Sequence, residues 1–423
     1  MLNQKAKEAI FSHQKNNLIF PHYQDYCLAN IPNTILSLFN ISPNGPTLPK
    51  GTIPNQKQYQ HIILVLIDGL GFLSFKKHQK QFRFLTQNAV VNPLTSIFPS
   101  TTAAALTTLQ TNTLPKEHGL FEWNLYIPEI GKIINTLPFC LQHSHQSDEL
   151  LKLGYSPKIL LHQKTIFQTL QENSVKSFSF SHKSYAHSVF SKISRKEAKN
   201  IPFTDLADLF VNLKDAIVGI NQKHQKAFFY VYIDYLDTIA HQYGPESKQY
   251  EAEINQITYM LKTVLFKNLK KESLKDTLLL LTADHGQIAI NPKETIYLNQ
   301  FYELKKNLKT NPKGKPILAT GGPRDVFLHI KKNKVRETIS YLKKKLDGKA
   351  NIYSTKVLVK KGLFGSCRGS RRFYQRLGEV LILPQKNYTV WLEKGNKKIS
   401  KLGHHGGLSA QEMVIPFIAK DKF

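Results

Sequence analysis

Cysteine is scarce in this chain of 423 residues, which contains only Cys27, Cys140 and Cys367. These three are too few and too scattered to form a disulfide framework or a cysteine-based zinc site. A protein without disulfides suits a reducing compartment. The first residues, MLNQKAKEAIFSHQKNN, have no apolar stretch of the kind that secretory signals contain, so we expect a cytoplasmic protein.

Long hydrophobic runs are also absent. The longest, IILVLI at residues 62–67, stops at Asp68 and is far too short to span a bilayer, so we expect no membrane partner. Acidic residues are few as well, 30 against 58 lysines and arginines, which gives a formal net charge of +28. Such an excess suits an anionic substrate or a nucleic acid. The lysines are dispersed and no nucleic-acid-binding motif occurs, so we expect a solvated basic surface and no specific nucleic-acid binding.

Three nearly continuous apolar runs indicate strands that are buried on both faces, as in a parallel sheet. They span residues 62–68, 227–234 and 277–284. Between them lie helical patterns at residues 101–110, 163–173, 204–222 and 247–270. This alternation predicts an α/β fold, a doubly wound and mostly parallel sheet flanked by helices.

A change of pattern near the C-terminus indicates a second structural unit. A Pro- and Gly-rich segment at residues 311–325 precedes short strand patterns and a Lys-rich helix near residues 334–346. We therefore predict an α/β core formed by residues 1–300 and 396–423, with a smaller α+β insertion or cap at residues 301–395.

Carboxylates end the three predicted strands at Asp68, Asp234 and Asp284, and His285 follows the last of them. Because ligands bind beyond the carboxyl ends of parallel strands, these acids should gather at one edge of the sheet. Asp237 and His241 are four residues apart, which places them on one face of a helix, a spacing typical of zinc-binding helices.

Two further segments add chemistry to this set. His404 and His405 lie in a Gly-rich loop, and oxygen and nitrogen ligands together favour zinc, with manganese or iron behind it. Ser100, Thr101 and Thr102 precede an Ala-rich helical run. A hydroxyl there lies where backbone N–H groups and the helix dipole favour an oxyanion, although it is equally typical of an ordinary N-cap.

The segments LIDGLGF, FPSTTAAALTTLQTNTLPKEHG, DYLDTIAHQYGP, LTADHGQ and HHGGLS, in this order, resemble the alkaline phosphatase superfamily. Within it they are similar to the type I phosphodiesterase and nucleotide pyrophosphatase family. Ala105 stands where vertebrate-type members have an asparagine that binds a phosphoryl oxygen, and the Ala run resembles a bacterial and archaeal branch. The missing donor would then come from the helix N-terminus or from another side chain, for which Arg324 and Arg368 are candidates.

The resemblance also implies residue roles. It places the nucleophile on Thr102, one metal ion on Asp68, Thr102, Asp284 and His285, and a second on Asp237, His241 and His405. Neighbouring residues remain as alternatives: Thr101 or Ser100 for the nucleophile, Asp234 for Asp237, and His404 for His405.

The implied activity is hydrolysis of phosphodiester or pyrophosphate bonds through a covalent phosphothreonine (nucleotidyl-type) intermediate. Its cofactors would be two divalent metal ions, zinc first, and its substrate a small anionic phosphoester such as a nucleotide. The same site would also serve a phosphomonoesterase or a phosphonate hydrolase. A further alternative is a non-catalytic binding protein that retains the fold.

Overall fold

The computed structural model describes residues 2–12, 14, 17–55, 57–144, 146–392 and 398–423. Its centre is a seven-stranded sheet with the strand order β2-β18-β9-β1-β8-β6-β7. All neighbours pair in parallel except β18, which is antiparallel to both β9 and β2. The strands are β1 (His61–Ile67), β2 (Val90–Thr95), β6 (Lys176–His182), β7 (Lys199–Phe203), β8 (Ala227–Ile233), β9 (Thr277–Thr282) and β18 (Val414–Lys420). The predicted doubly wound, mostly parallel sheet is confirmed.

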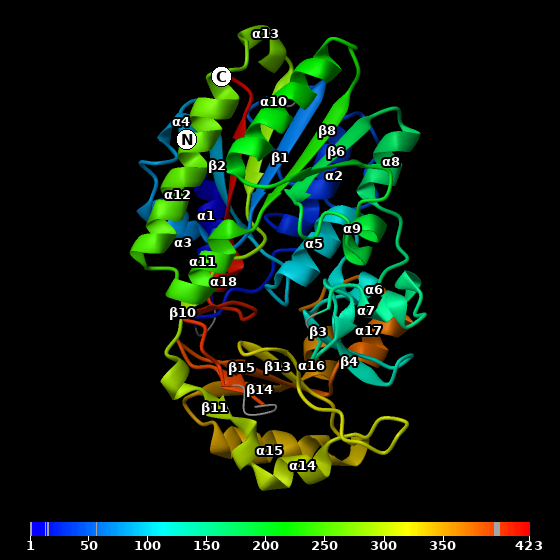
Figure 1. Cartoon of the computed structure of the whole chain (residues 1–423). Coiled ribbons are helices and arrows are strands. Elements are labelled where there is room, and N and C mark those ends of the chain that lie inside the picture. Colours follow the sequence, from blue (N-terminus) through cyan, green and yellow to red (C-terminus); the bar gives the residue numbers. More distant parts are fainter. Residues whose placement is uncertain (1, 13, 15–16, 56, 145, 393–397) are drawn as a thin grey trace.

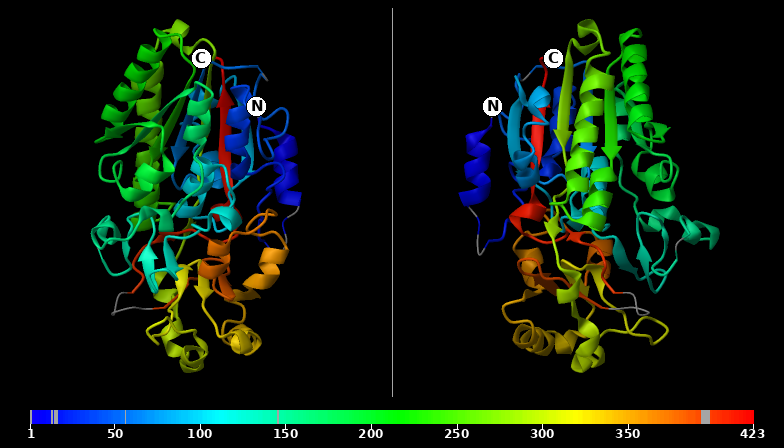
Figure 2. Two further views of the ribbon diagram at one scale, coloured as in Figure 1. Left: turned by 90° about the vertical axis from the view of Figure 1, so that its right-hand side faces the viewer. Right: turned by 60° about the vertical axis from the view of Figure 1, so that its left-hand side comes forward.

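The central strands form where the apolar runs predicted them. Every residue of β1, β8, β9 and β18 is buried, because helices cover both faces of the sheet (Figures 1 and 2). The helices of this part are α1 (Gln4–Ser12), α2 (Ile31–Leu38), α3 (Phe72–Lys77), α4 (Arg83–Thr86), α5 (Thr102–Thr111), α6 (Pro115–His118), α7 (Glu149–Lys152), α8 (Ile166–Glu172), α9 (Val189–Ser194), α10 (Leu206–Asn221), α11 (Tyr235–Tyr243), α12 (Lys248–Met260), α13 (Lys271–Leu274) and α18 (Ala410–Met413).

The strand order explains how the helices divide between the two faces. Connections between parallel strands are right-handed, so the face that a helix covers depends on the direction in which the chain moves across the sheet. Moving from β7 to β8 and from β8 to β9 places α10, α11 and α12 on one face, where α10 and α11 both contact α12. Moving from β2 to β6 and from β6 to β7 places α5, α8 and α9 on the other.

A second sheet lies beyond the carboxyl end of the first, at the bottom of Figure 1. Its four antiparallel strands have the order β12-β13-β15-β14 and pack on helices with a hydrophobic cluster of their own. The elements are β12 (Thr320–Gly322), β13 (Asp325–Leu328), β14 (Ala350–Ser354), β15 (Val380–Pro384), α14 (Tyr302–Asn307), α15 (Val335–Lys345), α16 (Thr355–Lys360) and α17 (Arg371–Arg376). We refer to residues 301–395 as the cap region; its predicted boundary with residue 396 lies outside the described residues.

Short elements fill the space between the two sheets. Strands β3 (Asn124–Ile127), β4 (Lys132–Asn135) and β5 (Cys140–Leu141) form a small antiparallel sheet, and β3 contacts β12 of the cap region. Two strand pairs connect the cap region to the rest of the chain: β10 (Ile288–Ala289) with β17 (Gly403–His404), and β11 (Ile296–Tyr297) with β16 (Val390–Trp391). The gap between the sheets is therefore bordered by segments from distant parts of the sequence.

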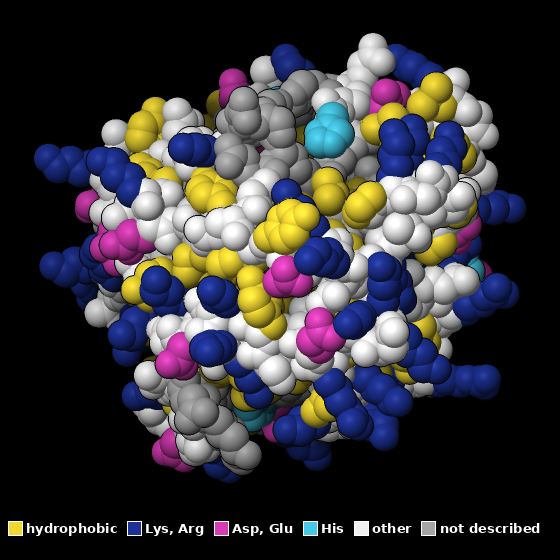
Figure 3. Space-filling view, turned by 90° about the horizontal axis from the view of Figure 1, so that it is seen from below, with side chains coloured by type: hydrophobic (Ala, Val, Ile, Leu, Met, Phe, Trp, Pro, Cys, Tyr) yellow, Lys and Arg dark blue, Asp and Glu magenta, His cyan; other side chains and the backbone are white. Residues whose placement is uncertain are grey.

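The surface explains where the excess of basic residues lies. Seen from the cap side, lysine and arginine side chains outnumber acidic ones and are spread over the face instead of forming one patch (Figure 3). This dispersal agrees with a solvated basic surface. Across the described residues, every helix is too short or too polar to cross a membrane.

Candidate active site

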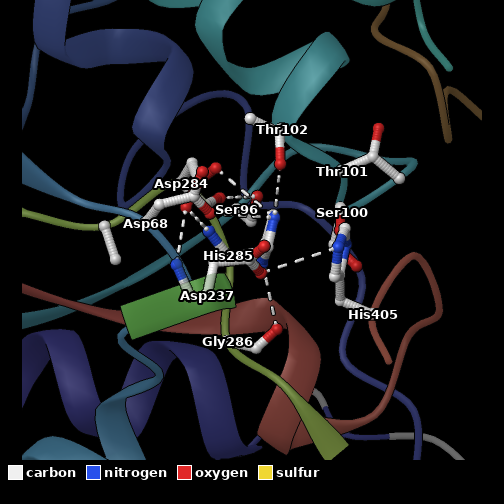
Figure 4. Close-up of polar contacts among 12 residues, drawn as sticks. Asp68, Ser96, Ser100, Thr101, Thr102, Asp237, Asp284, His285, Gly286 and His405 are labelled. Carbon is white, nitrogen blue, oxygen red and sulfur yellow. Dashed lines mark hydrogen bonds and ion pairs between the residues drawn. The ribbon is translucent and has the colours of Figure 1, made fainter. Parts of the chain in front are cut away.

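The candidate site lies beyond the carboxyl ends of β9, β1 and β8, which are adjacent in the sheet. Asp68 follows β1, Asp284 and His285 follow β9, and α11, which carries Asp237, follows β8. Residues that are far apart in the sequence thus converge in one place, as Figure 4 shows. The expectation that strand-end acids gather at one edge of the sheet agrees with this arrangement.

Helix α5 brings Thr102 to the same place. Thr101 has an extended backbone at the N-cap position, and the alanines that follow Thr102 favour a helix small enough to be buried against its neighbours. Asn112 ends the helix in the left-handed conformation. Thr102 is therefore the first helical residue, and its side chain points at His285 (Figure 4).

His285 is the centre of a first group of contacts. Its Nε2 lies 3.1 Å from Thr102 Oγ1, 3.5 Å from Asp68 Oδ1 and 3.4 Å from Asp284 Oδ2. The imidazole and both carboxylates are buried. Backbone N–H groups of Gly69 and His285 donate to Oδ1 of Asp284, at 3.1 and 2.9 Å, and hold that carboxylate in place.

Asp237 is the centre of a second group. Its Oδ2 lies 3.4 Å from His241 Nε2, and its Oδ1 lies 3.8 Å from His405 Nε2. The rings of His285 and His405 are stacked, with centroids 3.6 Å apart, so the two groups are in contact. Asp237 belongs to both groups that could hold a metal ion, one with His241 and His405 and the other with Asp68 and His285.

The three histidines are oriented in the same way. The Nδ1 atom of each lies within hydrogen-bond distance of a backbone carbonyl: Gly403 O at 2.7 Å for His241, Gly286 O at 3.1 Å for His285 and Ser100 O at 3.0 Å for His405. Because a carbonyl can only accept, Nδ1 carries the hydrogen and Nε2 keeps its lone pair when the ring is neutral. Metal-binding histidines are typically held in this tautomer.

The electrostatics of the site favour a cation. Burial, followed by the neighbouring carboxylates, raises the pKa of Asp68 well above its ordinary value and that of Asp284 to about 7. Burial also lowers the pKa of His285 and brings that of His405 to about 4, so both rings are neutral at pH 7. Buried carboxylates that repel one another, beside imidazoles with free lone pairs, would be stabilised by divalent positive charge.

Unpartnered oxygens support the same conclusion. Asp68 Oδ1 and Asp284 Oδ2 are buried and accept no hydrogen bond from any described residue. A buried carboxylate oxygen without a partner is energetically costly, and cation binding is one way to satisfy it. The residues present therefore fit divalent metal ions with oxygen and nitrogen ligands.

The alternatives left open by the sequence occupy different positions. Ser100 Oγ donates to Gly407 O at 2.8 Å and Thr101 Oγ1 donates to Phe121 O at 3.2 Å, so both hydroxyls bind backbone, whereas Thr102 faces the cluster of carboxylates and imidazoles. Asp234 and His404 line the same cavity but belong to neither candidate metal-binding group among the described residues.

Two residues that sequence reasoning missed orient the cluster. Tyr232 on β8 donates its hydroxyl hydrogen to Asp68 Oδ2, and Gln287 donates to Asp237 Oδ1. Tyr232 lies in the apolar run of β8. The alternation of side chains between the two faces of the sheet does not show whether this tyrosine lies in the core or faces a site. Gln287 lies only two residues after His285, and this proximity is the signal that could have found it.

The structure contradicts the suggestion that Arg324 or Arg368 supplies a donor to the phosphoryl group. Arg324 is buried in an ion pair with Glu412, with two hydrogen bonds of 3.0 Å, and it also donates to Tyr388 O. Arg368 is exposed, and neither side chain lines the cavity at Thr102. Sequence position could not reveal that the donors of Arg324 are already used inside the protein.

A cavity of about 940 Å³ opens at Thr102. Asp68, Asp237, His241 and His405 line it together with residues of the cap region. Trp123 and Trp391, the two tryptophans of the chain, lie on its walls, one from the loop before β3 and one from β16. This volume suits a drug-sized ligand, and the indoles offer a fluorescence signal for ligand binding.

The loops that follow β1 and β9 pack closely against each other at two glycines, Gly71 and Gly286. A Cβ atom added at Gly286, next to His285, would lie 2.1 Å from Gln411 O and 2.7 Å from the Cα atom of Gly71. Only glycine permits this approach between the loops that follow β1 and β9. The position of His285 therefore depends on the adjoining residue having no side chain.

A pair of buried carboxyl groups connects the cap region to the core beside the cavity. Glu122, which lines the cavity, interacts electrostatically with Asp325 on β13, and both side chains are buried. Buried carboxyl groups that lie near each other favour their protonated forms. Burial, the largest cause, raises the pKa of Glu122 to about 7 and that of Asp325 well above its ordinary value.

We expect Glu122→Gln to reduce the dependence of stability on pH. In the folded protein Glu122 binds its proton more tightly than in the unfolded chain, so the free energy of unfolding falls as the pH rises from about 4.5 to about 7. Glutamine has no proton that titrates in this range. Urea unfolding at pH 5 and pH 8 should show a decrease smaller than in the wild type by on the order of 2 kcal/mol.

The exposed residue Glu129 provides a matched control, because Glu129→Gln changes the same charge outside the pair. That variant should show the wild-type change in stability between the two pH values. Equal pH dependence in Glu122→Gln and wild type would contradict the raised pKa of Glu122 in the folded protein.

Comparisons with known proteins agree with this geometry. The family model described as type I phosphodiesterase / nucleotide pyrophosphatase matches residues 62–408. No curated protein sequence gives a significant match. Murine ectonucleotide pyrophosphatase / phosphodiesterase 5 is similar in structure, with a TM-score of 0.63, 19% sequence identity and coverage of 85% of this chain and 87% of that one.

Two related structures are similar over the same shares of the chains, 85% of this one and 87% of the other. One is an inactive threonine-to-alanine variant of the murine protein in complex with AMP, with a TM-score of 0.63 and 19% identity. The other is the human protein, with a TM-score of 0.64 and 18% identity. At such identities the likeness shows a shared fold.

Proposed function

The chain belongs to the type I phosphodiesterase / nucleotide pyrophosphatase family and is a phosphoric diester hydrolase, and from this premise we propose that it acts with two divalent metal ions through a covalent intermediate on Thr102. The observation that carries the proposal is the position of Thr102 Oγ1, 3.1 Å from His285 Nε2 at the edge of a carboxylate and imidazole cluster. A hydroxyl at that place is surrounded by the groups that would activate it.

The ligand assignment follows the two groups of contacts. Asp68, Thr102, Asp284 and His285 would hold one ion, and Asp237, His241 and His405 the other. Such ions, with zinc first by ligand type, would lower the pKa of the threonine hydroxyl and of a water molecule and would neutralise phosphoryl oxygens.

The residues of the chain supply nucleophile and orientation. Thr102 Oγ1 attacks phosphorus in line, the P–O bond to the leaving group breaks, and the ester on Thr102 is then hydrolysed by water, which restores the hydroxyl. Ala105 is buried and has no polar side chain, so backbone N–H groups of the first turn of α5 would donate to a phosphoryl oxygen instead.

The cavity supports a substrate with groups on both sides of the phosphorus. Its volume, about 940 Å³, leaves room for two ester arms, and its tryptophans suit planar groups. We include nucleotides among the proposed substrates because a structure of similar fold holds AMP.

Hydrolysis of bis(p-nitrophenyl) phosphate and p-nitrophenyl phosphate by the zinc-loaded protein tests the proposal. We expect kcat/KM for the diester to exceed that for the monoester by about tenfold or more, and dipicolinate to abolish both activities until zinc is restored. A preference for the monoester would instead indicate a phosphomonoesterase. No turnover of either by protein shown to contain zinc would contradict the catalytic proposal.

A further inference from the structure

Three arginine side chains are buried in the described part of the chain, and one of them differs from the others. Arg324 forms the ion pair with Glu412, and Arg376 donates to three backbone carbonyls, those of Gly119, Ile159 and Leu160. Neither lines the cavity at Thr102. Arg195 does line that cavity although only 4% of its surface is exposed.

The surroundings of Arg195 leave much of its guanidinium unused. Nη1 donates to Ser181 Oγ at 2.6 Å, and the group lies 5.9 Å from the centroid of the Tyr230 ring. Nε has no hydrogen-bond partner among the described residues, and no ion pair joins Arg195 to any described carboxylate. A buried cation without a counter-charge is costly unless a ligand supplies one.

Among the described residues, Arg195 is not part of the hydrogen-bond network around Thr102 and His285. It follows α9, which packs against α5, and it forms no hydrogen bond or ion pair with Thr102 or the metal-ligand cluster among the described residues. Ser184, Ser188 and Ser191 line the same cavity, but their hydroxyls are already hydrogen-bonded within the chain. The guanidinium of Arg195, with its unused donors, matches a planar or tetrahedral oxyanion.

We propose that Arg195 binds a second anionic group of the substrate, a carboxylate or a phosphate, on an ester arm that extends from the phosphorus held at Thr102. The inference rests on the proposed function, because it assumes that the substrate is a phosphodiester. It makes Arg195 a specificity-determining residue: substrates with a charged arm are preferred over neutral diesters of equal size.

Alkyl p-nitrophenyl phosphates test this proposal. Each substrate has an alkyl arm that ends in a methyl group, a carboxylate or a phosphate, and the arm length is increased stepwise. In the wild type we expect kcat/KM for the best charged arm to exceed that for its methyl counterpart by about 10- to 100-fold. Arg195→Met should remove this preference while changing kcat/KM for the methyl arm less than about threefold.

The preference is a ratio measured on one preparation, so partial unfolding of the variant does not alter it. Arg195→Lys, which keeps the charge but not the fork of donors, should retain part of the preference. Arg368→Met removes an exposed arginine outside the cavity and should leave the ratio unchanged. The arm with the larger loss identifies the group that Arg195 binds.

Two results would overturn the inference: equal rates for charged and methyl arms in the wild type, or an unchanged preference in Arg195→Met. Absence of turnover of every diester would contradict the proposed function instead. In that case, the affinities for the charged and methyl substrates still test the role of Arg195. They are measured from the quenching of the fluorescence of Trp123 and Trp391. Equal affinities of wild type and Arg195→Met for the charged substrate would then overturn it.

Discussion

Thr102→Ala is expected to lower kcat for an aryl phosphodiester by about 10⁴-fold or more, because removal of a nucleophile that forms a covalent intermediate eliminates the reaction path. The fold should persist. Thr102 begins α5 as its first residue, alanine has a high helix propensity, and the helix already continues with three alanines. Metal content and the quenching of tryptophan fluorescence by AMP should therefore remain near the wild-type values.

Neighbouring hydroxyls provide matched controls for this experiment. Thr101→Ala removes a hydroxyl that donates to Phe121 O, and Ser100→Ala removes one that donates to Gly407 O. Both changes cost a buried hydrogen bond, about 1 kcal/mol of stability, but leave Oγ1 of Thr102 beside His285. Their kcat values should stay within about tenfold of the wild type, and Thr102→Ser should retain part of the activity.

An outcome in which Thr102→Ala turns over the diester at the wild-type rate would exclude Thr102 as nucleophile. Loss of activity in Thr101→Ala with full metal content would move that role to Thr101. The measurement thus decides between alternatives that the sequence leaves open and that the geometry ranks by the distance to His285.

The fold could be predicted from the sequence because its signals are local. The apolar runs that form β1, β8 and β9 are nearly continuous, and an aspartate follows each of them, Asp68, Asp234 and Asp284. Asp68, Asp284 and the Asp237–His241 pair follow from strand ends and helical spacing, so their convergence needed only the general geometry of parallel sheets. His405 required the motif resemblance, because nothing in a Gly-rich loop shows which strand end it approaches.

Other features depend on contacts that no local pattern encodes. Glu122 and Asp325 lie about two hundred positions apart, and their electrostatic interaction exists only because the cap region folds back onto the core. The residues next to Arg195 and Arg324 in the sequence do not indicate which of the two arginines forms an internal ion pair. Arg324 is buried beside Glu412 and forms an internal ion pair with it. Arg195 is buried at the cavity with no carboxylate partner among the described residues, which makes it a candidate for ligand binding.

Asp284→Asn is expected to have opposite effects on stability in the metal-free and metal-loaded protein. Without metal, burial and the neighbouring Asp237 raise the pKa of Asp284 to about 7, which reflects a charge that the fold tolerates poorly. Asparagine removes this charge, and its oxygen can still accept from the backbone N–H groups of Gly69 and His285. The metal-free variant should therefore unfold at a higher temperature than metal-free wild type.

With zinc present the order should reverse. Cations that bind only the folded state stabilise it by about 2.7 kcal/mol when their concentration is 100 times the dissociation constant, and the variant lacks one ligand. We expect about one equivalent of zinc to be lost and kcat to fall by about 10³-fold or more, since the ion at Thr102 is the one affected. Thermal unfolding with and without dipicolinate, together with elemental analysis, measures both effects. As a control, Asp276→Asn changes a half-buried carboxylate beside Lys57, at the opposite end of β9 from Asp284.

The predicted loss of zinc and the predicted change in stability can be contradicted independently of each other. Tight binding of two zinc ions by Asp284→Asn would contradict its role as a ligand, even if activity fell. A metal-free variant less stable than metal-free wild type would show instead that Asp284 contributes mainly through hydrogen bonds that asparagine cannot replace. Only a reversal in the order of stability between the two states supports carboxylates that are destabilising by themselves and are stabilised by bound divalent ions.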